Sequence, residues 1–411
     1  MLNPPPKLAP VPPIPNAHST SAPPSSPPST ASPPPSPSSP SPSSPSSNKL
    51  EGYHSYLIVF LEPIRDFLFD EEVSEIMING PHQIYIEKRG KLHKTSARFN
   101  SEESLQAAVV NIAQSVGRRI DEKNPRLDAR LPDGSRIHAV LPPCARKGTY
   151  VSIRKFMRHA MNMEKLISFG AITPKAAEFL DICVKMKKNI LVAGGTGSGK
   201  TSLLNVISSF IPEGDRVIVI EDASELQLQQ EHILTMETKA PDKHGEGGVS
   251  IRDLIHSSLR MRPDRIVIGE VRGAEALDLL QALNTGHGGS MSTIHANSPR
   301  DALSRLETMC LMSGIEMPLR AFRDQIASAL QIVVYTNRFS DGSRKVTHIT
   351  EVLPLSEDGK YQLQDVFYFK RQSNTPDGRV QGKMIPTGYL PSFSQEAIQN
   401  GFPLTKEFFQ V

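Results

Sequence analysis

The residues best suited to chemistry lie at positions 194–201, which read GGTGSGKT. Glycines let the backbone N–H groups of a loop turn inward around phosphates, and the N-terminus of a following helix adds positive potential. Lys200 can then reach the outer phosphates of ATP, and the Thr201 hydroxyl can ligate Mg²⁺. The residues expected to bind ATP are Gly194, Gly195, Thr196, Gly197, Ser198, Gly199, Lys200, Thr201 and Ser202.

The sequence on either side predicts that this stretch joins a strand to a helix. Residues 189–193 form a short apolar run, typical of a buried strand, and residues 202–210 carry apolar side chains at helical spacing. A glycine-rich turn that binds nothing is the alternative. The strand–loop–helix context favours a phosphate loop.

Two predicted strands that follow the phosphate loop end in acids. The apolar run at 265–269 leads to Glu270, and the run at 216–220 leads to Glu221. Carboxylates at the carboxyl edge of a parallel sheet face the ligand crevice, where one can polarise an attacking water or hold Mg²⁺ through water. We expect Glu270 to do both and Glu221 to be the second catalytic candidate. The alternatives are a solvated strand end for Glu270 and a helix cap for Asp222.

The segment 285–297 reads TGHGGSMSTIHAN and places His287 before a predicted strand and His295 at its end. We expect His295 to sense the phosphates. A metal site formed by the two histidines is an alternative, but no acid or cysteine lies close by in sequence. A satisfied core histidine is a further alternative for either residue.

Composition limits the class of protein. The chain has 411 residues, enough for two or three domains, and a net charge of +3, which does not by itself indicate a nucleic-acid surface. Cys144, Cys183 and Cys310 are scattered, so neither a zinc knuckle nor a disulfide framework is supported. No apolar run approaches the roughly 18 residues of a membrane span, and no signal core begins the chain. We expect a cytoplasmic protein that reaches a membrane only through partners.

The chain divides by composition and pattern. The head is rich in Pro and Ser and should be disordered, as a solvated extension or, alternatively, a tether. Strands that alternate with helices around the phosphate loop predict an α/β fold with a parallel sheet. The predicted segments are the head (1–47), a smaller mixed α/β domain (53–156), a linker (157–173), the phosphate-loop domain (174–340) and a C-terminal hairpin and tail region (341–411).

Four motifs, in this order, resemble those of the secretion ATPases of the type II/type IV superfamily. GGTGSGKT (194–201), IEDASEL (220–226), RPDRIVIGEVRG (262–273) and TGHGGSMSTIHANS (285–298) are similar to its Walker A, Asp box, Walker B and His box. Segments 75–92 and 120–143 further resemble the CpaF-type ATPases of tight-adherence (Flp) pili. The resemblance covers about residues 55–400 and leaves out the head. The chain also lacks the tetracysteine zinc module of the GspE branch.

This resemblance implies a homo-hexameric ring. Each subunit would have an N-terminal domain and a RecA-like P-loop NTPase domain, with ATP between them. Arg136 and Arg154 match the N-terminal-domain arginines that reach the phosphates in this superfamily. Arg130 is a competitor for this role, and ordinary exposed strand arginines are the structural alternative.

The expected function is an ATP-hydrolysing motor for pilus assembly or protein secretion at the inner membrane. Its partners would be an inner-membrane platform protein and, indirectly, a pilin or an exported protein; nucleic acid is not expected. A DNA translocase on the same core is one alternative, and a nucleotide-gated scaffold without turnover is another. The presence of Lys200, Thr201 and Glu270 together argues against the scaffold.

Overall fold

The structure is a computed structural model, and it describes residues 59–88, 90–131, 133–156, 161–241, 245–372, 375 and 378–410. The predicted Pro/Ser-rich head lies outside the described residues. The chain divides into two units, Met1–Asn48 and Lys49–Val411, and every element below belongs to the second. Among the described residues, no helix is long and apolar enough to cross a membrane.

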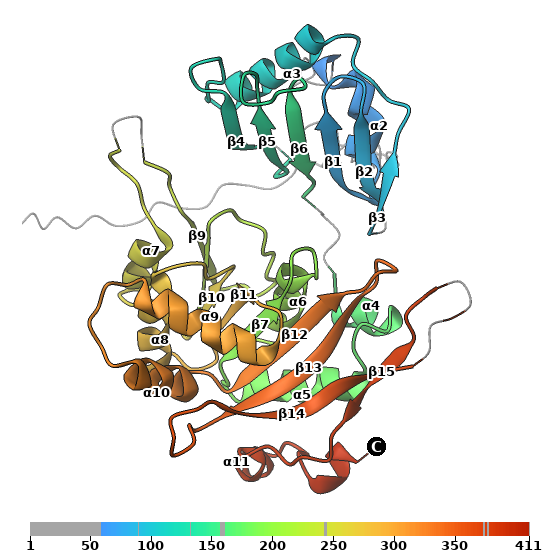
Figure 1. Ribbon diagram of the computed structural model, residues 1–411. Helices are drawn as coiled ribbons and strands as arrows, with labels where there is room; N and C mark the ends of the chain where they lie inside the picture. Colours follow the sequence, from blue (N-terminus) through green and yellow to red (C-terminus); the bar gives the residue numbers. More distant parts are fainter. Residues whose placement is uncertain are drawn as a thin grey trace, which may run out of the picture. The chain divides into compact units, whose positions relative to one another are not determined.

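The smaller domain is built on a six-stranded antiparallel sheet with the order β3-β2-β1-β6-β5-β4 (Figure 1). Side chains alternate between buried and exposed along β5 and β6, so one face of the sheet is packed. Helices α2 (Arg65–Phe69) and α3 (Glu102–Ser115) contribute to the core on that face. The strands are β1 (Val73–Asn79), β2 (Ile84–Lys88), β3 (Lys91–Lys94), β4 (Arg126–Arg130), β5 (Arg136–Val140) and β6 (Tyr150–Arg154).

The larger domain contains a nine-stranded sheet with the order β15-β14-β13-β12-β7-β11-β10-β8-β9. The six strands from β12 to β9 in this order are parallel to one another, as predicted. Strands β7, β8 and β10 are buried along their whole length, as expected for parallel strands covered on both faces. The parallel strands are β7 (Ile190–Gly194), β8 (Val217–Glu221), β9 (Ile233–Glu237), β10 (Arg265–Ile268), β11 (Met291–His295) and β12 (Ile332–Arg338).

The strands predicted beyond residue 340 continue this same sheet. A tight turn at Asp341–Gly342 returns the chain from β12 into β13 (Arg344–Leu353), which pairs with β12 in antiparallel fashion. β14 (Gln362–Arg371) and β15 (Gly382–Pro386) then extend the sheet outward. The sheet therefore runs across the predicted boundary at residue 340.

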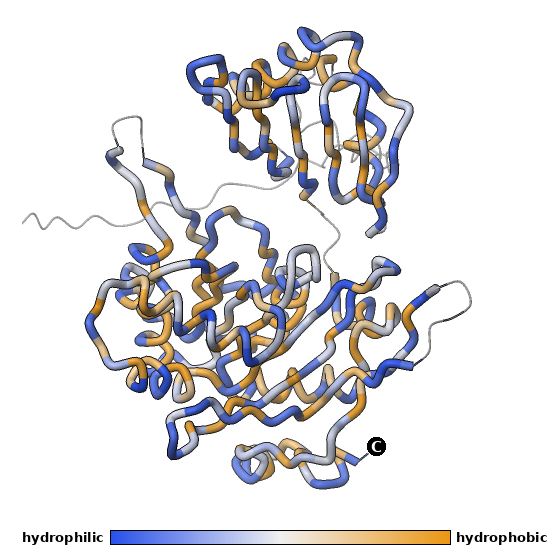
Figure 2. Tube along the Cα trace, in the orientation of Figure 1, coloured by the Kyte–Doolittle hydropathy of each residue, from blue (hydrophilic) through white to orange (hydrophobic). Residues whose placement is uncertain are grey.

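Helices cover both faces of the large sheet (Figure 1). One core holds side chains of α5 (Pro174–Lys185), α6 (Lys200–Ser208) and α11 (Ser394–Gln399). The other holds side chains of α7 (Ile251–Ser258), α8 (Glu275–Asn284), α9 (Pro299–Leu311) and α10 (Leu319–Ala329). Figure 2 shows hydrophobic segments concentrated along the strands between these layers.

The last part of the predicted linker is held against the large sheet. Short helix α4 (Met163–Ser168) ends just before Gly170, and the Lys345 ammonium in β13 donates to the Gly170 carbonyl at 3.1 Å. The Val346 N–H donates to the Ala171 carbonyl at 2.9 Å. The linker and the first residues of β13 are therefore joined by hydrogen bonds.

A fully buried arginine begins β10. The Arg265 Nε donates to Asp215 at 2.7 Å, and its terminal nitrogen donates to the Val184 carbonyl at 2.9 Å. Gly289 passes directly beside this guanidinium with φ at +82°, and a Cβ there would lie 1.9 Å from the Arg265 nitrogen. Position 289 therefore requires glycine for two independent reasons, its backbone conformation and the space that Arg265 occupies.

We predict that Gly289→Ala lowers the free energy of unfolding by about 3 kcal/mol, from left-handed strain and overpacking together. Gly286 is the matched control, since its φ is +103° but nothing lies within 4 Å of an added Cβ. Gly286→Ala should therefore cost only about 1 kcal/mol. Urea unfolding of both variants measures the difference, and equal losses would contradict the steric account.

Candidate active site

The phosphate loop lies between β7 and α6, the context that the sequence predicts. Gly197 and Gly199 adopt left-handed φ angles of +68° and +91°, and Gly199 is the residue that caps α6. Such angles are strained for any residue with a Cβ. The two glycines therefore let the chain turn sharply into the helix, with the N-terminus of α6 facing the loop.

Contacts from β12 and β13 hold the loop from outside. The Thr336 hydroxyl donates to the Ser198 carbonyl at 3.0 Å, and the Arg344 Nε donates to the Gly197 carbonyl at 2.8 Å. In a trans peptide the next N–H points opposite to the carbonyl. The N–H groups of Ser198 and Gly199 therefore point away from Thr336 and Arg344, toward the inside of the loop, where that of Ser198 donates to the Gly195 carbonyl at 3.4 Å.

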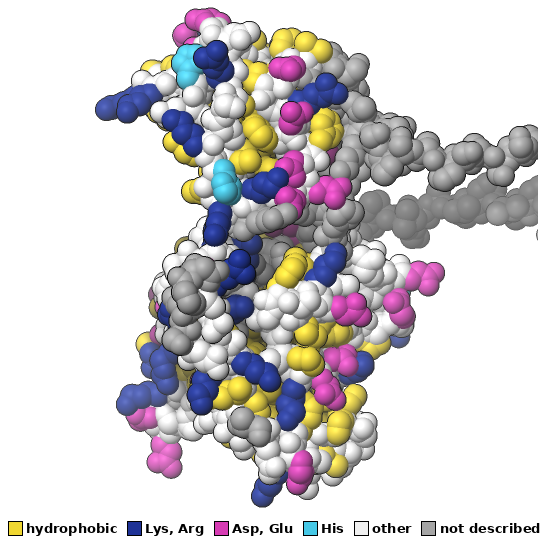
Figure 3. All heavy atoms as spheres, turned by 90° about the vertical axis from the view of Figure 1, so that its right-hand side faces the viewer, with side chains coloured by type: hydrophobic (Ala, Val, Ile, Leu, Met, Phe, Trp, Pro, Cys, Tyr) yellow, Lys and Arg dark blue, Asp and Glu magenta, His cyan; other side chains and the backbone are white. Residues whose placement is uncertain are grey.

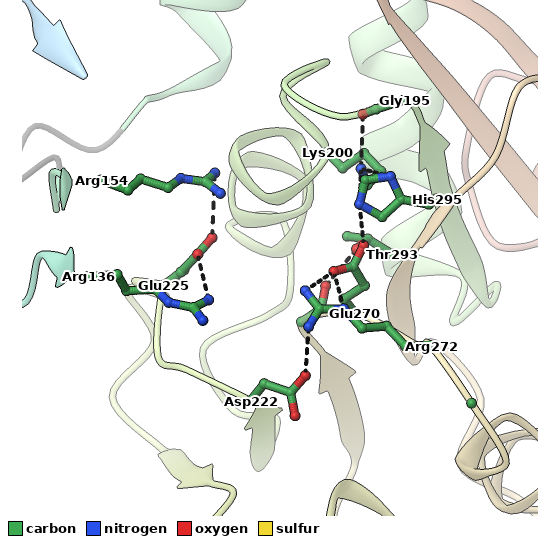
Figure 4. A network of polar contacts seen from close by, with 12 residues as sticks. Arg136, Arg154, Gly195, Lys200, Asp222, Glu225, Glu270, Arg272, Thr293 and His295 are labelled. Carbon is green, nitrogen blue, oxygen red and sulfur yellow. Dashed lines mark hydrogen bonds and ion pairs between the residues drawn. The ribbon is translucent and has the colours of Figure 1, made fainter. Parts of the chain in front are cut away.

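Lys200 lies at the start of α6 with its ammonium folded back over the loop (Figure 4). Its Nζ donates to the Gly195 carbonyl at 3.0 Å and lies 3.4 Å from each ring nitrogen of His295. Burial lowers the pKa of Lys200, and the nearby Arg154 adds to this shift while Glu270 opposes it. Lys200 is therefore a partly desolvated cation beside the loop glycines.

Glu270 and His295 meet because Glu270 follows the end of β10 by two residues and His295 ends the neighbouring parallel strand β11. The His295 Nε2 lies 3.0 Å from Glu270, and the Arg272 Nε donates to the other carboxylate oxygen at 2.7 Å. Arg272 also reaches Asp222 at 3.1 Å (Figure 4). Burial, followed by the charge of Lys200, lowers the pKa of His295. Neutral His295 therefore connects the loop lysine to the carboxylate predicted as general base.

Glu221 ends β8 and is 3% exposed. Its carboxylate accepts the N–H groups of Glu225 and Leu226 at 2.9 and 3.0 Å. Burial raises the pKa of Glu221 to about 7, although these two hydrogen bonds oppose the shift. A pKa near neutrality suits an acid–base group, while the two hydrogen bonds also hold the segment that carries Glu225.

The small-domain arginines point toward an acid of the large domain (Figure 4). Arg136 and Arg154 lie directly opposite each other on β5 and β6, and each has a guanidinium nitrogen 3.9 Å from Glu225. Arg130 is the cross-strand neighbour of Arg136 on β4 and lies 3.4 Å from Glu237. Arg136 and Arg154 therefore approach the Asp-box segment, and their contact with ATP stays a prediction.

The two histidines considered as a metal pair lie at opposite ends of β11. His295 is its last residue, whereas His287 precedes it and contacts the Ala282 carbonyl at 3.2 Å. A strand of five residues separates its ends by about 13 Å. The alternative of a two-histidine metal site is therefore wrong. Within the described ranges, no group of three His, Cys, Asp or Glu side chains is placed to hold a metal ion.

Three contributors to the site were not expected from the sequence: Arg272, Thr336 and Arg344. Arg272 comes two residues after Glu270, and in an extended segment such residues face the same side, so a local signal existed. Thr336 and Arg344 come from a hairpin more than 130 residues beyond the loop they contact. Only the order of strands in the sheet brings them there.

Comparison with known proteins agrees with this geometry. Residues 60–355 match the family described as "Type II/IV secretion system protein". A Mycobacterium tuberculosis protein, described provisionally as a conjugal transfer protein, is 35% identical over 317 residues, which are 76% of this chain and 88% of that protein. Type IV secretion system protein VirB11 of Bartonella quintana is 33% identical, with 70% of this chain and 91% of that protein covered.

A solved structure supports the fold. The pilus retraction motor PilT, crystallised with bound ADP, aligns with a TM-score of 0.51 and 20% identity over 75% of this chain and 85% of that chain. The match to the family spans both described domains and most of the chain. The chain therefore belongs to the type II/IV secretion system protein family.

Proposed function

We propose that this chain is the ATP-hydrolysing motor of a Flp-type pilus or a related secretion system and works as a homo-hexamer. The observation that carries the proposal is the link from Lys200 to Glu270 through the His295 ring, whose Nδ1 lies 3.4 Å from Lys200 and whose Nε2 lies 3.0 Å from Glu270. It joins a cation beside the phosphate loop to a carboxylate that can polarise an attacking water. Because His295 contacts both groups, it can respond to a change in charge at Lys200 or at Glu270.

The loop residues suit a bound polyphosphate with a divalent cation. The Ser198 hydroxyl is buried without a hydrogen-bond partner, and Lys200 is partly desolvated, so both favour an anion in the loop. Thr201 would hold Mg²⁺ directly, and Glu270 would hold it through water. When bound, Mg²⁺ supplies positive charge to the phosphoryl group that is transferred. Glu221, with a pKa of about 7, is the second candidate for proton transfer.

The system-level proposal is an inner-membrane motor that a platform protein recruits and that moves a pilin or an exported protein indirectly. The names of the relatives, conjugal transfer protein and VirB11, support this class of machine. The segments at 75–92 and 120–143 favour the Flp-pilus branch. On the face drawn in Figure 3, Lys and Arg side chains are interspersed with Asp and Glu side chains, which supports a protein partner over a polynucleotide. Stimulation of turnover by added DNA would instead favour the translocase alternative.

Glu270→Gln should retain ATP binding and lower turnover by about 10²–10⁴, the usual contribution of a positioned base. The amide keeps the shape of the side chain and removes its charge. Phosphate release by the full chain is the measurement. Asp222→Asn is the matched control, because it removes the other carboxylate partner of Arg272 and should retain most of the turnover. If Glu270→Gln turns over normally, Glu221 becomes the leading base.

Arg136→Ala and Arg154→Ala should each bind ATP and lose most of their turnover, by up to the roughly 10³–10⁵ that an arginine finger contributes. We expect this loss because both guanidinium groups extend from the small domain to Glu225, in the Asp-box segment beside the candidate site. Arg130→Ala, which removes the contact with Glu237, should be much less affected. The opposite ranking in a steady-state assay would assign the finger to Arg130.

A further inference from the structure

A row of charged side chains crosses the sheet of the small domain, one from each of five neighbouring strands. In register from β4 to β2 they are Arg130, Arg136, Arg154, Glu75 and Glu87. Three basic residues are followed by two acidic ones. Each neighbour in the row is a direct cross-strand partner of the next, so the β-sheet itself fixes their order and spacing.

The larger domain presents charges of the opposite sign along this row. Glu237 lies beside the first arginine and Glu225 beside the second and third. The acidic end meets Arg338 and Arg344, which face each other across the β12–β13 hairpin. The two domains therefore place opposite charges together at every position of the row except Glu75.

The acidic end has the shortest contact of the row. Glu87 is 11% exposed, and one carboxylate oxygen lies 2.6 Å from Arg338 and 3.6 Å from Arg344. The other oxygen accepts the Ser74 hydroxyl at 2.8 Å, and a β-bulge at Ser74 brings that hydroxyl into line. Like charges directly across a hairpin repel, so Glu87 supplies the counter-charge that the arginine pair needs.

Arg344 also contacts the phosphate loop. Its Nε donates to the Gly197 carbonyl while its terminal nitrogen faces Glu87. Burial lowers the pKa of Arg344, and Glu87 opposes this shift. At the hairpin tip, Gly342 and Gly90 of the small domain meet through their backbones: a Cβ on Gly90 would lie 3.0 Å from the Gly342 carbonyl oxygen. Contacts thus run without a break from β2 through Arg344 to the loop.

We propose that Glu87 is a positioning residue of the nucleotide site and acts through Arg344. It holds Arg344 where the guanidinium keeps the Gly197 carbonyl turned outward, and so keeps the Ser198 N–H turned into the loop, where a bound phosphate would replace the Gly195 carbonyl as its acceptor. The inference rests on the nucleotide site proposed above. It makes nucleotide affinity depend on contact between the small domain and the β12–β13 hairpin. By reciprocity, bound nucleotide strengthens that contact by the same factor.

The test is a double-mutant cycle on the affinity of the full chain for ADP, measured by isothermal titration calorimetry. Glu87→Gln removes a charge-assisted contact and should weaken ADP binding about tenfold. Arg344→Gln should have an effect of similar size. Because both act through one contact, the double variant should bind about as weakly as either single variant. Wild-type affinity of Glu87→Gln, or effects that multiply in the double variant, would overturn the proposal.

The controls separate this proposal from the nucleotide site itself. Glu237→Gln removes another carboxylate that faces a small-domain arginine, and it should leave ADP affinity unchanged. Lys200→Ala should abolish ADP binding with either Glu or Gln at position 87. If the wild-type chain does not bind ADP, the nucleotide site itself is refuted. Ser74→Ala removes only the hydroxyl that donates to Glu87, so it should weaken ADP binding a few-fold. It takes the place of Glu87→Gln if Glu87→Gln does not fold. Thermal unfolding without nucleotide reports folding for each variant.

Discussion

The site depends on the planarity of the peptide bond. A loop can turn its N–H groups toward a phosphate only if the attached carbonyls point elsewhere, and a carbonyl removed from water needs a donor. In this chain the donors are Thr336 of β12, the strand beside β7, and Arg344 of β13, the next strand outward. The nine-stranded sheet therefore supports the loop directly as well as providing the core.

Charge is the second organising factor. Lys200, Arg272 and Arg344 lie around the loop, and carboxylates of Glu270 and Glu87 accompany them. A cation that loses water needs an anion close by, so each such group has an acidic neighbour or a defined acceptor. The same carboxylates limit how strongly the cations attract a polyphosphate. The balance between the carboxylates and a polyphosphate as partners of the cations depends on how close the two domains lie, because Glu87 belongs to one domain and Arg344 to the other.

The sequence predicted the local placement of the candidate site residues. The phosphate loop, its flanking strand and helix, and Glu270 at a strand end all follow from short-range patterns, and parallel strands place their carboxyl ends along one edge. His295 also lies where its position at the end of a strand predicts. The predicted domain boundary at residue 340 falls inside the observed sheet, because β13 pairs with β12 through a tight turn. No change in composition marks such a pairing.

What the sequence did not reveal is long-range. Nothing local distinguishes Glu87 from any other strand glutamate, because its role depends on which surface of the large domain it meets. Likewise, Thr336 looks like an ordinary β-branched strand residue, and only its place beside β7 gives its hydroxyl the Ser198 carbonyl as acceptor. The sequence predicts that Arg265 begins a strand. The spacing of residues does not reveal that its side chain is buried against Gly289.

The order of the charged row restricts how the domains can move. Neighbouring strands are about 4.8 Å apart, so a sideways slip by two strands, about 10 Å, would bring Arg154 over the arginine pair of the hairpin. Such a slip exchanges attraction for repulsion at this end of the row. Tilting the small domain away at one end of the row, by contrast, breaks the contacts one after another and keeps the charged side chains in the same order. The charged row therefore opposes a large sideways shift of the small domain more strongly than a tilt.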